Sequence, residues 1–274
     1  MSSSIEILNG IRKSKSCQPE LVIKHGPSLL SSSSISNNEL YNIHEQIVIA
    51  SLELGLSNIG DRSLKVLKKK FPKSCRVSTL VGMEHESKGN YNDALEIYKS
   101  LLVEYPGNLA VMKRNVSVYK ATGDHKNAIE EIHKILKYYP GDASTWQELS
   151  DIHLSLSDYT AAAYCHEELI LIDANCSYYH THLADIYYTI GGVDSVFKAR
   201  KHYSMSLALQ NPKSNLRALY GLISASKYLA EEYSQGKGNT ADVDVNAALL
   251  KFALEQLSSI KFNNEQIKKI ITEI

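Results

Sequence analysis

The sequence is poor in the residues that interrupt helices and lacks the features of a secreted or membrane-spanning chain. Of its 274 residues only six are proline and fourteen are glycine, which disfavours an all-β plan with many turns. It has no apolar stretch of about 18 residues and no apolar signal-peptide core, so neither a membrane span nor secretion is expected. Four scattered cysteines show no C-x-x-C pattern and indicate reduced thiols in a cytosolic protein: Cys17, Cys75, Cys165 and Cys176.

An excess of either charge is also missing. Lysine plus arginine and aspartate plus glutamate each number 30, so the formal net charge is zero. A protein that grips nucleic acid through its phosphates usually has a basic excess or stripe, so no nucleic-acid partner is expected. The H-E-x-x-H, P-loop, G-x-S-x-G and G-x-G-x-x-G motifs are all absent. The sequence therefore predicts a protein that is not an enzyme and holds no cofactor.

Three columns of residues recur every 34 positions, the length of a tetratricopeptide repeat. The first is Gly55, Gly89, Gly123, Ser157 and Gly191; the second is Pro72, Pro106, Pro140 and then Ala174; the third is Gly60, Ala94, Ala128 and Ala162. Glycine permits the turn after the first helix of a hairpin, and proline stops the second helix. The small residue of the third column allows the two helices to approach closely.

The columns predict an all-α tetratricopeptide-repeat solenoid of about five helical hairpins with closing C-terminal helices. Helix pairs are expected at 41–54 with 58–71, 76–88 with 92–105, 110–122 with 126–139, and 144–156 with 160–172. A fifth pair starts at 178–190 and continues to Asn211 after an insertion near Gly192–Val196. Aromatic and branched residues such as Trp146, Leu149 and Tyr187 are expected to fill the seams between helices.

The predicted domain plan has three parts. Residues 1–37, with the serine run Ser31–Ser34, form an N-terminal tail or short helix, and residues 38–212 form the solenoid. Residues 213–274 form capping helices at 214–230, 244–258 and 264–273, with a polar loop near 231–243. Atypical end helices are expected because a terminal unit must shield the last apolar face from water.

The ten histidines suggest a metal or catalytic site, but their repeat positions argue against one. Six of them share columns with aromatic residues and so are predicted to pack at helix seams: His44, His85, His125, His153, His166 and His180. His180 and His182 are two residues apart on a helix and so point to different faces. No metal ligand set is predicted.

In a tetratricopeptide stack the first helix of each pair lines a concave groove. This assigns fourteen residues to a partner-binding surface: Glu45, Ile49, Glu53, Arg76, Met83, Glu86, Lys113, Ser117, Lys120, Gln147, Asp151, Tyr178, Asp185 and Tyr188. Their mixed charge and apolar members suit an extended or helical peptide segment. Co-chaperone repeats clamp a C-terminal carboxylate with lysine and asparagine four residues apart, but here Lys113 is followed by Ser117, so the clamp is absent.

One stretch concentrates positive charge: Lys65, Lys68, Lys69, Lys70, Lys73 and Arg76. Lysines in the last turn of a helix complement its dipole, so a solvated helix end is the simpler interpretation. The alternative is a patch that meets anionic lipid headgroups or an acidic partner.

Several strings extend beyond the repeat columns. They are His44–Gly55, Lys69–Pro72, Gly141 with Asp142, Trp146–Asp151, Asp158–Leu169, Tyr188–Gly192 and Arg217–Leu222. With these strings the chain resembles the second subunit of the endoplasmic reticulum membrane protein complex, over about residues 40–230.

The resemblance implies a non-catalytic scaffold subunit, peripheral on the cytoplasmic face of the endoplasmic reticulum membrane. Its partners would be other subunits of the complex, both membrane-embedded and soluble, and these contacts would provide its membrane association. The complex would insert tail-anchored and multipass proteins. The alternative function is a free tetratricopeptide adaptor or co-chaperone that binds peptide tails transiently. The missing carboxylate clamp favours the scaffold.

Overall fold

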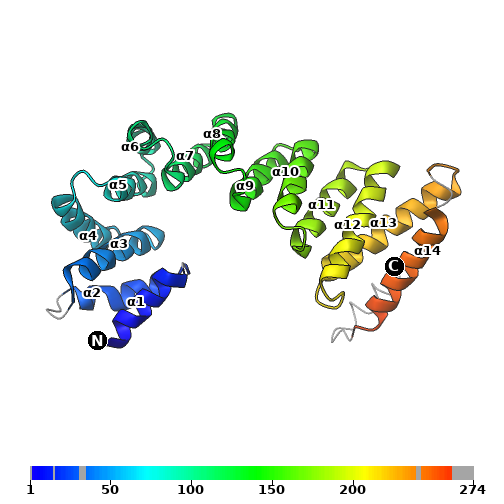
Figure 1. The fold of residues 1–274 in the computed structure, drawn as a ribbon, viewed down its shortest axis with the longest axis horizontal. Helices are drawn as coiled ribbons and strands as arrows, with labels where there is room; N and C mark the ends of the chain where they lie inside the picture. The colour runs from blue at the N-terminus through cyan, green and yellow to red at the C-terminus, as the bar shows by residue number, and fades with distance from the viewer. Residues whose placement is uncertain (1, 15, 31–34, 239–241, 261–274) are drawn as a thin grey trace. The chain divides into compact units, whose positions relative to one another are not determined.

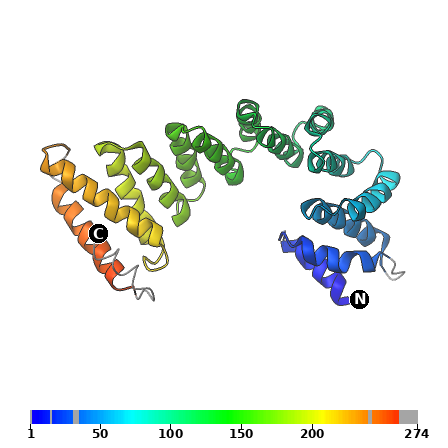
Figure 2. The ribbon, with the colours of Figure 1, turned by 180° about the vertical axis from the view of Figure 1, so that it is seen from behind.

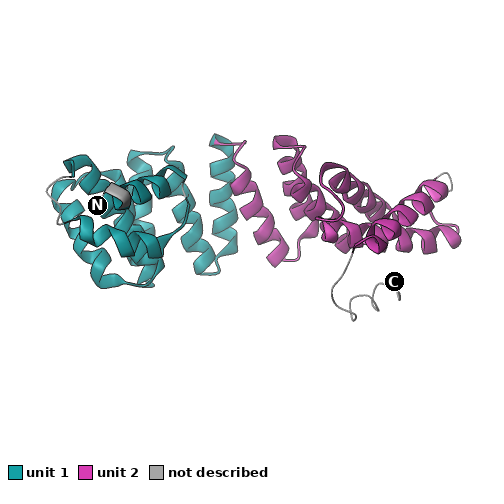
Figure 3. Cartoon of the chain, turned by 90° about the horizontal axis from the view of Figure 1, so that it is seen from below, with its two compact units in different colours: residues 1–138 teal, residues 139–274 magenta. Residues whose placement is uncertain are grey.

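The computed structural model describes residues 2–14, 16–30, 35–238 and 242–260. Within these residues the chain has fourteen α-helices and no strand (Figure 1), which confirms the all-α repeat fold. The chain divides into two compact units, Met1–Tyr138 (unit 1) and Tyr139–Ile274 (unit 2), shown in two colours in Figure 3. Each unit is described by itself.

Unit 1 is a series of helical hairpins preceded by two additional helices. Its helices are α1 (Ser2–Ser14), α2 (Pro19–Leu29), α3 (Asn37–Glu53), α4 (Ser57–Lys70), α5 (Cys75–Ser87), α6 (Tyr91–Glu104), α7 (Leu109–Ala121) and α8 (His125–Tyr138). The pairs α3 with α4, α5 with α6 and α7 with α8 are in contact, as the repeat predicts.

Unit 2 continues the same plan and ends in longer helices. Its helices are α9 (Ala143–Ser155), α10 (Tyr159–Ile172), α11 (Ser177–Ile190), α12 (Val193–Leu209), α13 (Leu216–Ser234) and α14 (Val243–Ser258). Figure 2 shows from behind how successive helices of this unit follow one another back and forth. The predicted closing helix 264–273 lies outside the described residues.

The glycine column marks the turn inside each hairpin. Gly55, Gly89, Gly123 and Gly191 all have positive φ angles, between 69° and 76°. Ser157 takes the fifth place in the column and has a φ of 58°, although it carries a Cβ. The backbone geometry is therefore set by the repeat even where the sequence departs from glycine.

The column of small residues lies at the closest approach of paired helices. Ala94, Ala128 and Ala162 are each 0 % exposed. At Gly60 an added Cβ would collide with the Ser51 side chain of the neighbouring helix α3. The close approach expected for this column is confirmed by the burial of the three alanines and by the contact at Gly60.

The N-terminal region forms two helices where the sequence predicts a tail or one short helix. Leu8 of α1 and Val22 and Leu29 of α2 are buried in a cluster with Ile43 and Ile47 of α3. The sequence pattern did not reveal this packing because the region lies outside the repeat columns. The serine run Ser31–Ser34 lies outside the described residues.

The insertion after Gly191 differs from the expectation of an interrupted hairpin. Gly191 and Gly192 both have positive φ angles and make a tight turn, and α12 begins at Val193. The additional residues lengthen that helix to 17 residues, against 14 in α10. They are helical because Val196 and Ala199 continue the apolar face that packs in the core of unit 2.

The added helical length places an arginine in the interior. Arg200 of α12 is 2 % exposed and donates to the Asn246 side chain of α14 at 2.9 Å and to Asp242 at 2.8 Å. Asp242 also accepts from the Tyr233 hydroxyl, and Asn246 donates to the main-chain oxygen of Ser226 at 2.8 Å. This buried polar network joins α12, α13 and α14.

Candidate partner-binding surfaces

The predicted groove residues all lie on the first helices of hairpins. In unit 1 they are on α3 (Glu45, Ile49, Glu53), α5 (Arg76, Met83, Glu86) and α7 (Lys113, Ser117, Lys120); in unit 2 they are on α9 (Gln147, Asp151) and α11 (Tyr178, Asp185, Tyr188). Their role as partner contacts stays a prediction. Within each unit, however, the structure shows which of these side chains already form hydrogen bonds or ion pairs.

Glu45 and Arg76 are brought together across two first helices. The guanidinium of Arg76 donates through Nε, at 3.2 Å, and through Nη2 to the two carboxylate oxygens of Glu45. Such two-point pairing fixes geometry as well as charge. The Arg76 side chain is nevertheless 72 % exposed, so the pair faces solvent.

A second contact joins α5 to α7. Glu86 accepts a hydrogen bond from the Tyr98 hydroxyl of α6 and lies 3.7 Å from Arg114 of α7. Burial and the hydrogen bond to Glu86 raise the pKa of Tyr98, so the hydroxyl remains a donor. The Glu86 carboxylate therefore links α5 to both α6 and α7.

Unit 2 repeats this arrangement with different residues. Asp185 of α11 accepts from the Tyr203 hydroxyl of α12 and from Arg217 Nε of α13, each at 2.6 Å. We call Glu86–Tyr98–Arg114 and Asp185–Tyr203–Arg217 the carboxylate–tyrosine–arginine triads. The sequence placed the two carboxylates in the groove but indicated neither the tyrosines nor the arginines as their partners. The signal that could have predicted these contacts is a carboxylate on one first helix and an arginine on the next, which occurs in both units.

The other predicted groove residues are in varied environments. Ile49 and Met83 are partly buried against the cluster that contains Val48 and Leu80, so they contribute mainly to packing. Glu53 accepts a hydrogen bond from the Cys17 thiol at 3.2 Å. The remaining members are half-buried or exposed: Lys113, Ser117, Lys120, Gln147, Asp151, Tyr178 and Tyr188. Tyr178 is 51 % exposed, so unit 2 presents at least one accessible aromatic side chain.

The prediction that histidines pack at seams is confirmed for His44, His166 and His180, which are buried. His85, His125 and His153 are half-buried. Burial, with a smaller contribution from neighbouring His182, lowers the pKa of His166 to about 4. His202, which is 3.1 Å from His180, has its pKa lowered to about 4 by burial and by that neighbour. The rings of His166 and His202 are therefore neutral at pH 7.

In the part of the chain that the structure describes, no group of three or more histidine, cysteine, aspartate or glutamate side chains is arranged to hold a metal ion. Within the same residues, no helix combines the length and the apolar character needed to cross a bilayer. The four cysteines are free, and burial raises the pKa of the Cys165 thiol to about 12.

The basic stretch is only partly neutralised. Lys68 lies 3.4 Å from Glu84, and Arg76 pairs with Glu45. For Lys65, Lys69, Lys70 and Lys73 the structure records no ion pair among the described residues. Lys68, Lys69 and Lys70 form the last turn of α4, where they complement the helix dipole.

Comparison with known proteins gives the family. A model described as the EMC2 TPR-like repeat domain matches residues 62–207. This chain is a member of the ER membrane protein complex subunit 2 family. ER membrane protein complex subunit 2 of Xenopus tropicalis is 37 % identical over 212 residues, which cover 77 % of this chain and 71 % of the frog protein. That of Dictyostelium discoideum is 32 % identical over 244 residues, covering 85 % and 76 %.

A further relative matches in sequence, and solved structures show the same fold. TPR repeat protein oca3 of Schizosaccharomyces pombe is 27 % identical over 174 residues, covering 63 % of this chain and 62 % of that protein. The C-terminal part of a TPR repeat-containing protein from Cytophaga hutchinsonii has a TM-score of 0.61 at 14 % identity, covering 96 % and 97 %. Pseudomonas aeruginosa PilF has a TM-score of 0.52 at 15 % identity, covering 86 % and 99 %. These structures support the tetratricopeptide fold alone.

Proposed function

We propose that the chain is a non-catalytic scaffold subunit of the ER membrane protein complex. In this function it lies on the cytoplasmic face of the endoplasmic reticulum membrane and is attached by contacts with other subunits, both membrane-embedded and soluble. It holds cytosolic segments of the membrane subunits, and through them it supports the insertion of tail-anchored and multipass proteins.

The observation that carries the proposal is the family membership, because the similarity to ER membrane protein complex subunit 2 extends over 77 % of the chain. The contacts between first helices are consistent with a scaffold. In the triads, Glu86 of α5 pairs with Arg114 of α7, and Asp185 of α11 pairs with Arg217 of α13. A surface held in this way is preorganised, which lowers the entropic cost of binding a partner.

The membership is tested by purifying the tagged chain from detergent-solubilised membranes and identifying the proteins that accompany it. Other subunits of the complex are expected in the purified sample. A chain that is wholly cytosolic and copurifies with no integral membrane protein would contradict the proposal and favour the free adaptor.

The role of the first helices is tested by reversing two charges on α7, Lys113→Glu with Lys120→Glu. Loss of a contact at a buried interface costs about 2 kcal/mol or more, roughly thirtyfold in affinity. We expect a folded chain with depleted membrane partners. The matched control is Lys126→Glu with Lys137→Glu, which makes the same charge change at exposed positions of the second helix α8. Equal loss in both variants would mean that net charge, and not the α7 surface, matters.

A further inference from the structure

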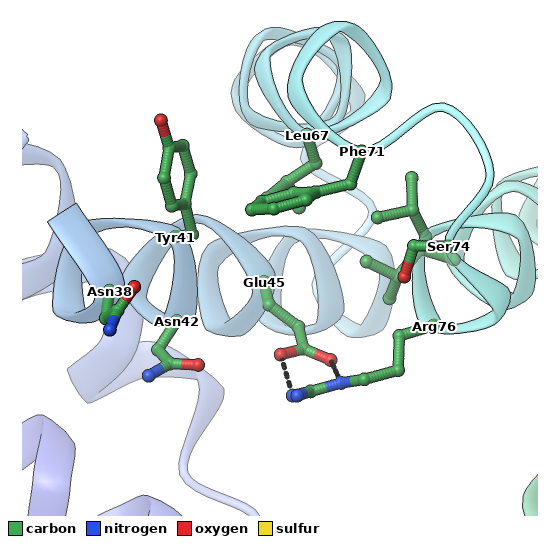
Figure 4. A pocket seen from close by; sticks show the side chains of 10 residues that line it. Asn38, Tyr41, Asn42, Glu45, Leu67, Phe71, Ser74 and Arg76 are labelled. Carbon is green, nitrogen blue, oxygen red and sulfur yellow. Dashed lines mark hydrogen bonds and ion pairs between the residues drawn. The ribbon is translucent and has the colours of Figure 1, made fainter.

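Unit 1 contains a pocket that the predicted groove residues only touch. It lies between α3, the end of α4 and the beginning of α5, and its volume is about 340 Å³. Figure 4 shows its walls, which are formed by Asn38, Tyr41, Asn42, Glu45, Leu67, Phe71, Ser74, Arg76, Val77 and Leu80. Of these, only Glu45 and Arg76 belong to the groove predicted from the sequence.

One side of the pocket is apolar and aromatic. The rings of Tyr41 and Phe71 meet edge to face, with their centroids 5.0 Å apart (Figure 4). Phe71 follows the last residue of α4 and precedes Pro72, so the chain leaves the helix there, and Phe71 is 38 % exposed. Leu67 and Leu80, which also line the pocket, are nearly fully buried. A large apolar side chain of a ligand can be buried against this side of the pocket.

The opposite rim carries two side-chain amides that have no partner among the described residues. Asn38 and Asn42 are four residues apart on α3 and so share one face of the helix. Neither side-chain amide makes a hydrogen bond within the described part of the chain. A carboxamide has both a donor and an acceptor, the same pair that each residue of an extended main chain presents. The two side chains are therefore suited to bind the main chain of a peptide.

The charges around the pocket favour an acidic ligand. The one carboxylate in its wall, Glu45, is neutralised by Arg76 through Nε and Nη2. The Nη1 group of Arg76 has no partner among the described residues, so the guanidinium keeps donors for a second carboxylate. Beside the wall formed by Phe71 and Ser74, the exposed residues Lys70 and Lys73 have no acidic partner in the described part of the chain.

We propose that this pocket binds an extended acidic peptide segment, placing one large apolar side chain against Tyr41 and Phe71. Asn38 and Asn42 hold the peptide main chain, while Arg76 and the neighbouring lysines attract the flanking carboxylates. The inference rests on the proposed function only in that it treats the chain as a scaffold for peptide segments. It specifies which kind of segment unit 1 binds.

The test measures fluorescence anisotropy with the full chain and a labelled peptide that has phenylalanine flanked by two aspartates on each side. Saturable binding is expected. Changing the phenylalanine to alanine, or the aspartates to lysines, should weaken binding at least tenfold. Equal binding of all three peptides would overturn the proposal. Copurification with other subunits does not depend on this result, so failure of the peptide site can be distinguished from failure of the proposed scaffold function.

Two protein variants locate the peptide. Asn42→Ala and Arg76→Gln should each weaken binding about tenfold, the size of one lost hydrogen bond to a charged or main-chain group. The controls are Asn92→Ala and Arg62→Gln, which change the same residue types at exposed positions outside the pocket. Unchanged melting curves show that the variants fold. Binding that the pocket variants leave intact would place the peptide elsewhere and contradict the inference.

A lipid surface is the competing ligand for the lysines. Sedimentation with phosphatidylcholine vesicles, with and without phosphatidylserine, tests it directly. Binding to the anionic vesicles that is lost on Lys69→Gln with Lys70→Gln and Lys73→Gln, together with no binding of the acidic peptide, would assign the charge to lipid and overturn the peptide site. Peptide binding without vesicle binding supports it.

Discussion

The two units join their helices with different chemistry, although both are built from the same hairpin. In unit 1 consecutive first helices are linked by ion pairs at the surface, as between Glu45 and Arg76. Unit 2 keeps a surface link between Asp185 and Arg217 but also buries the charge of Arg200 between α12 and α14. A regular repeat needs only apolar seams and surface pairs. In unit 2 a buried charge occurs where the period is lost, and it bonds helices of unequal length to one another.

The largest expected effect comes from removing that buried charge. Arg200→Ala removes the cation that pairs with Asp242 and the donor to Asn246, so Asp242 keeps only its bond from Tyr233 and Asn246 only its bond to Ser226. This should lower the free energy of unfolding by about 3–5 kcal/mol. Arg76→Ala removes an exposed partner in unit 1 and should cost at most about 1 kcal/mol. Urea unfolding followed by circular dichroism measures both. Similar costs would show that the two kinds of link do not differ.

Acid should affect unit 2 more than unit 1. The pKa values of His166 and His202 are about 4 in the folded chain because the rings are buried, against about 6.5 when unfolded. Between these values the unfolded chain binds more protons, so stability falls as the pH drops from 6.5 to 4, by up to about 3 kcal/mol for fully buried His166. In unit 1, burial lowers the pKa of His44 in the same direction.

The acid effect is checked by measuring the free energy of unfolding at pH 7 and pH 4.5. His166→Phe removes the titrating ring and should reduce the difference between the two values. The exposed His133 of unit 1 is the control, and His133→Gln should leave the difference unchanged. If the parent chain and both variants show the same pH dependence of stability, His166 is not the group that causes the acid effect.

A larger side chain at the seam of a hairpin should destabilise both units by a similar amount. Ala128 of unit 1 and Ala162 of unit 2 are each 0 % exposed where paired helices touch. Leucine at either position overpacks the seam and should cost about 1–3 kcal/mol. Glu130→Gln, an exposed change on α8, should stay within about 0.5 kcal/mol. Melting curves that do not separate the leucine variants from this control would mean that the helix register is wrong.

The smallest expected effect compares the two hairpin turns on either side of the boundary between the units. Gly123 has a φ of 73°, and Ser157 takes the equivalent place with a φ of 58°. Ser157→Gly removes the crowding of a Cβ in this conformation and should stabilise the chain by about 0.5–1 kcal/mol. Gly123→Ser should destabilise it by a similar amount. A change of the same sign in both variants would contradict the role of the column.

The repeat period predicted the hairpins well because its columns record local backbone requirements. The glycines mark positive φ angles, and Ala94, Ala128 and Ala162 mark the closest helix contacts. The binding surfaces were less predictable. The sequence placed Glu45 and Arg76 among groove residues, but the pocket also needs Tyr41, Asn38 and Asn42, which follow no column. It needs Phe71 as well, which precedes Pro72 as Tyr105 and Tyr139 precede the next two prolines of their column. The proline column marks where α4 ends, but the period does not describe which side chains the turn after α4 brings together.

By itself the sequence determined the all-α repeat, the hairpin turns, and the family, because each depends on residue types at fixed spacing along the chain. Only the tertiary structure decided which side chains meet across hairpins. Tyr98 reaches Glu86, and Tyr203 reaches Asp185, because each tyrosine lies on the second helix of the pair and crosses the seam to the first. Arg200 meets Asp242, 42 residues later, because α14 packs against α13 and brings the two side chains together. Contacts of this kind depend on helix packing in three dimensions, which no single spacing encodes.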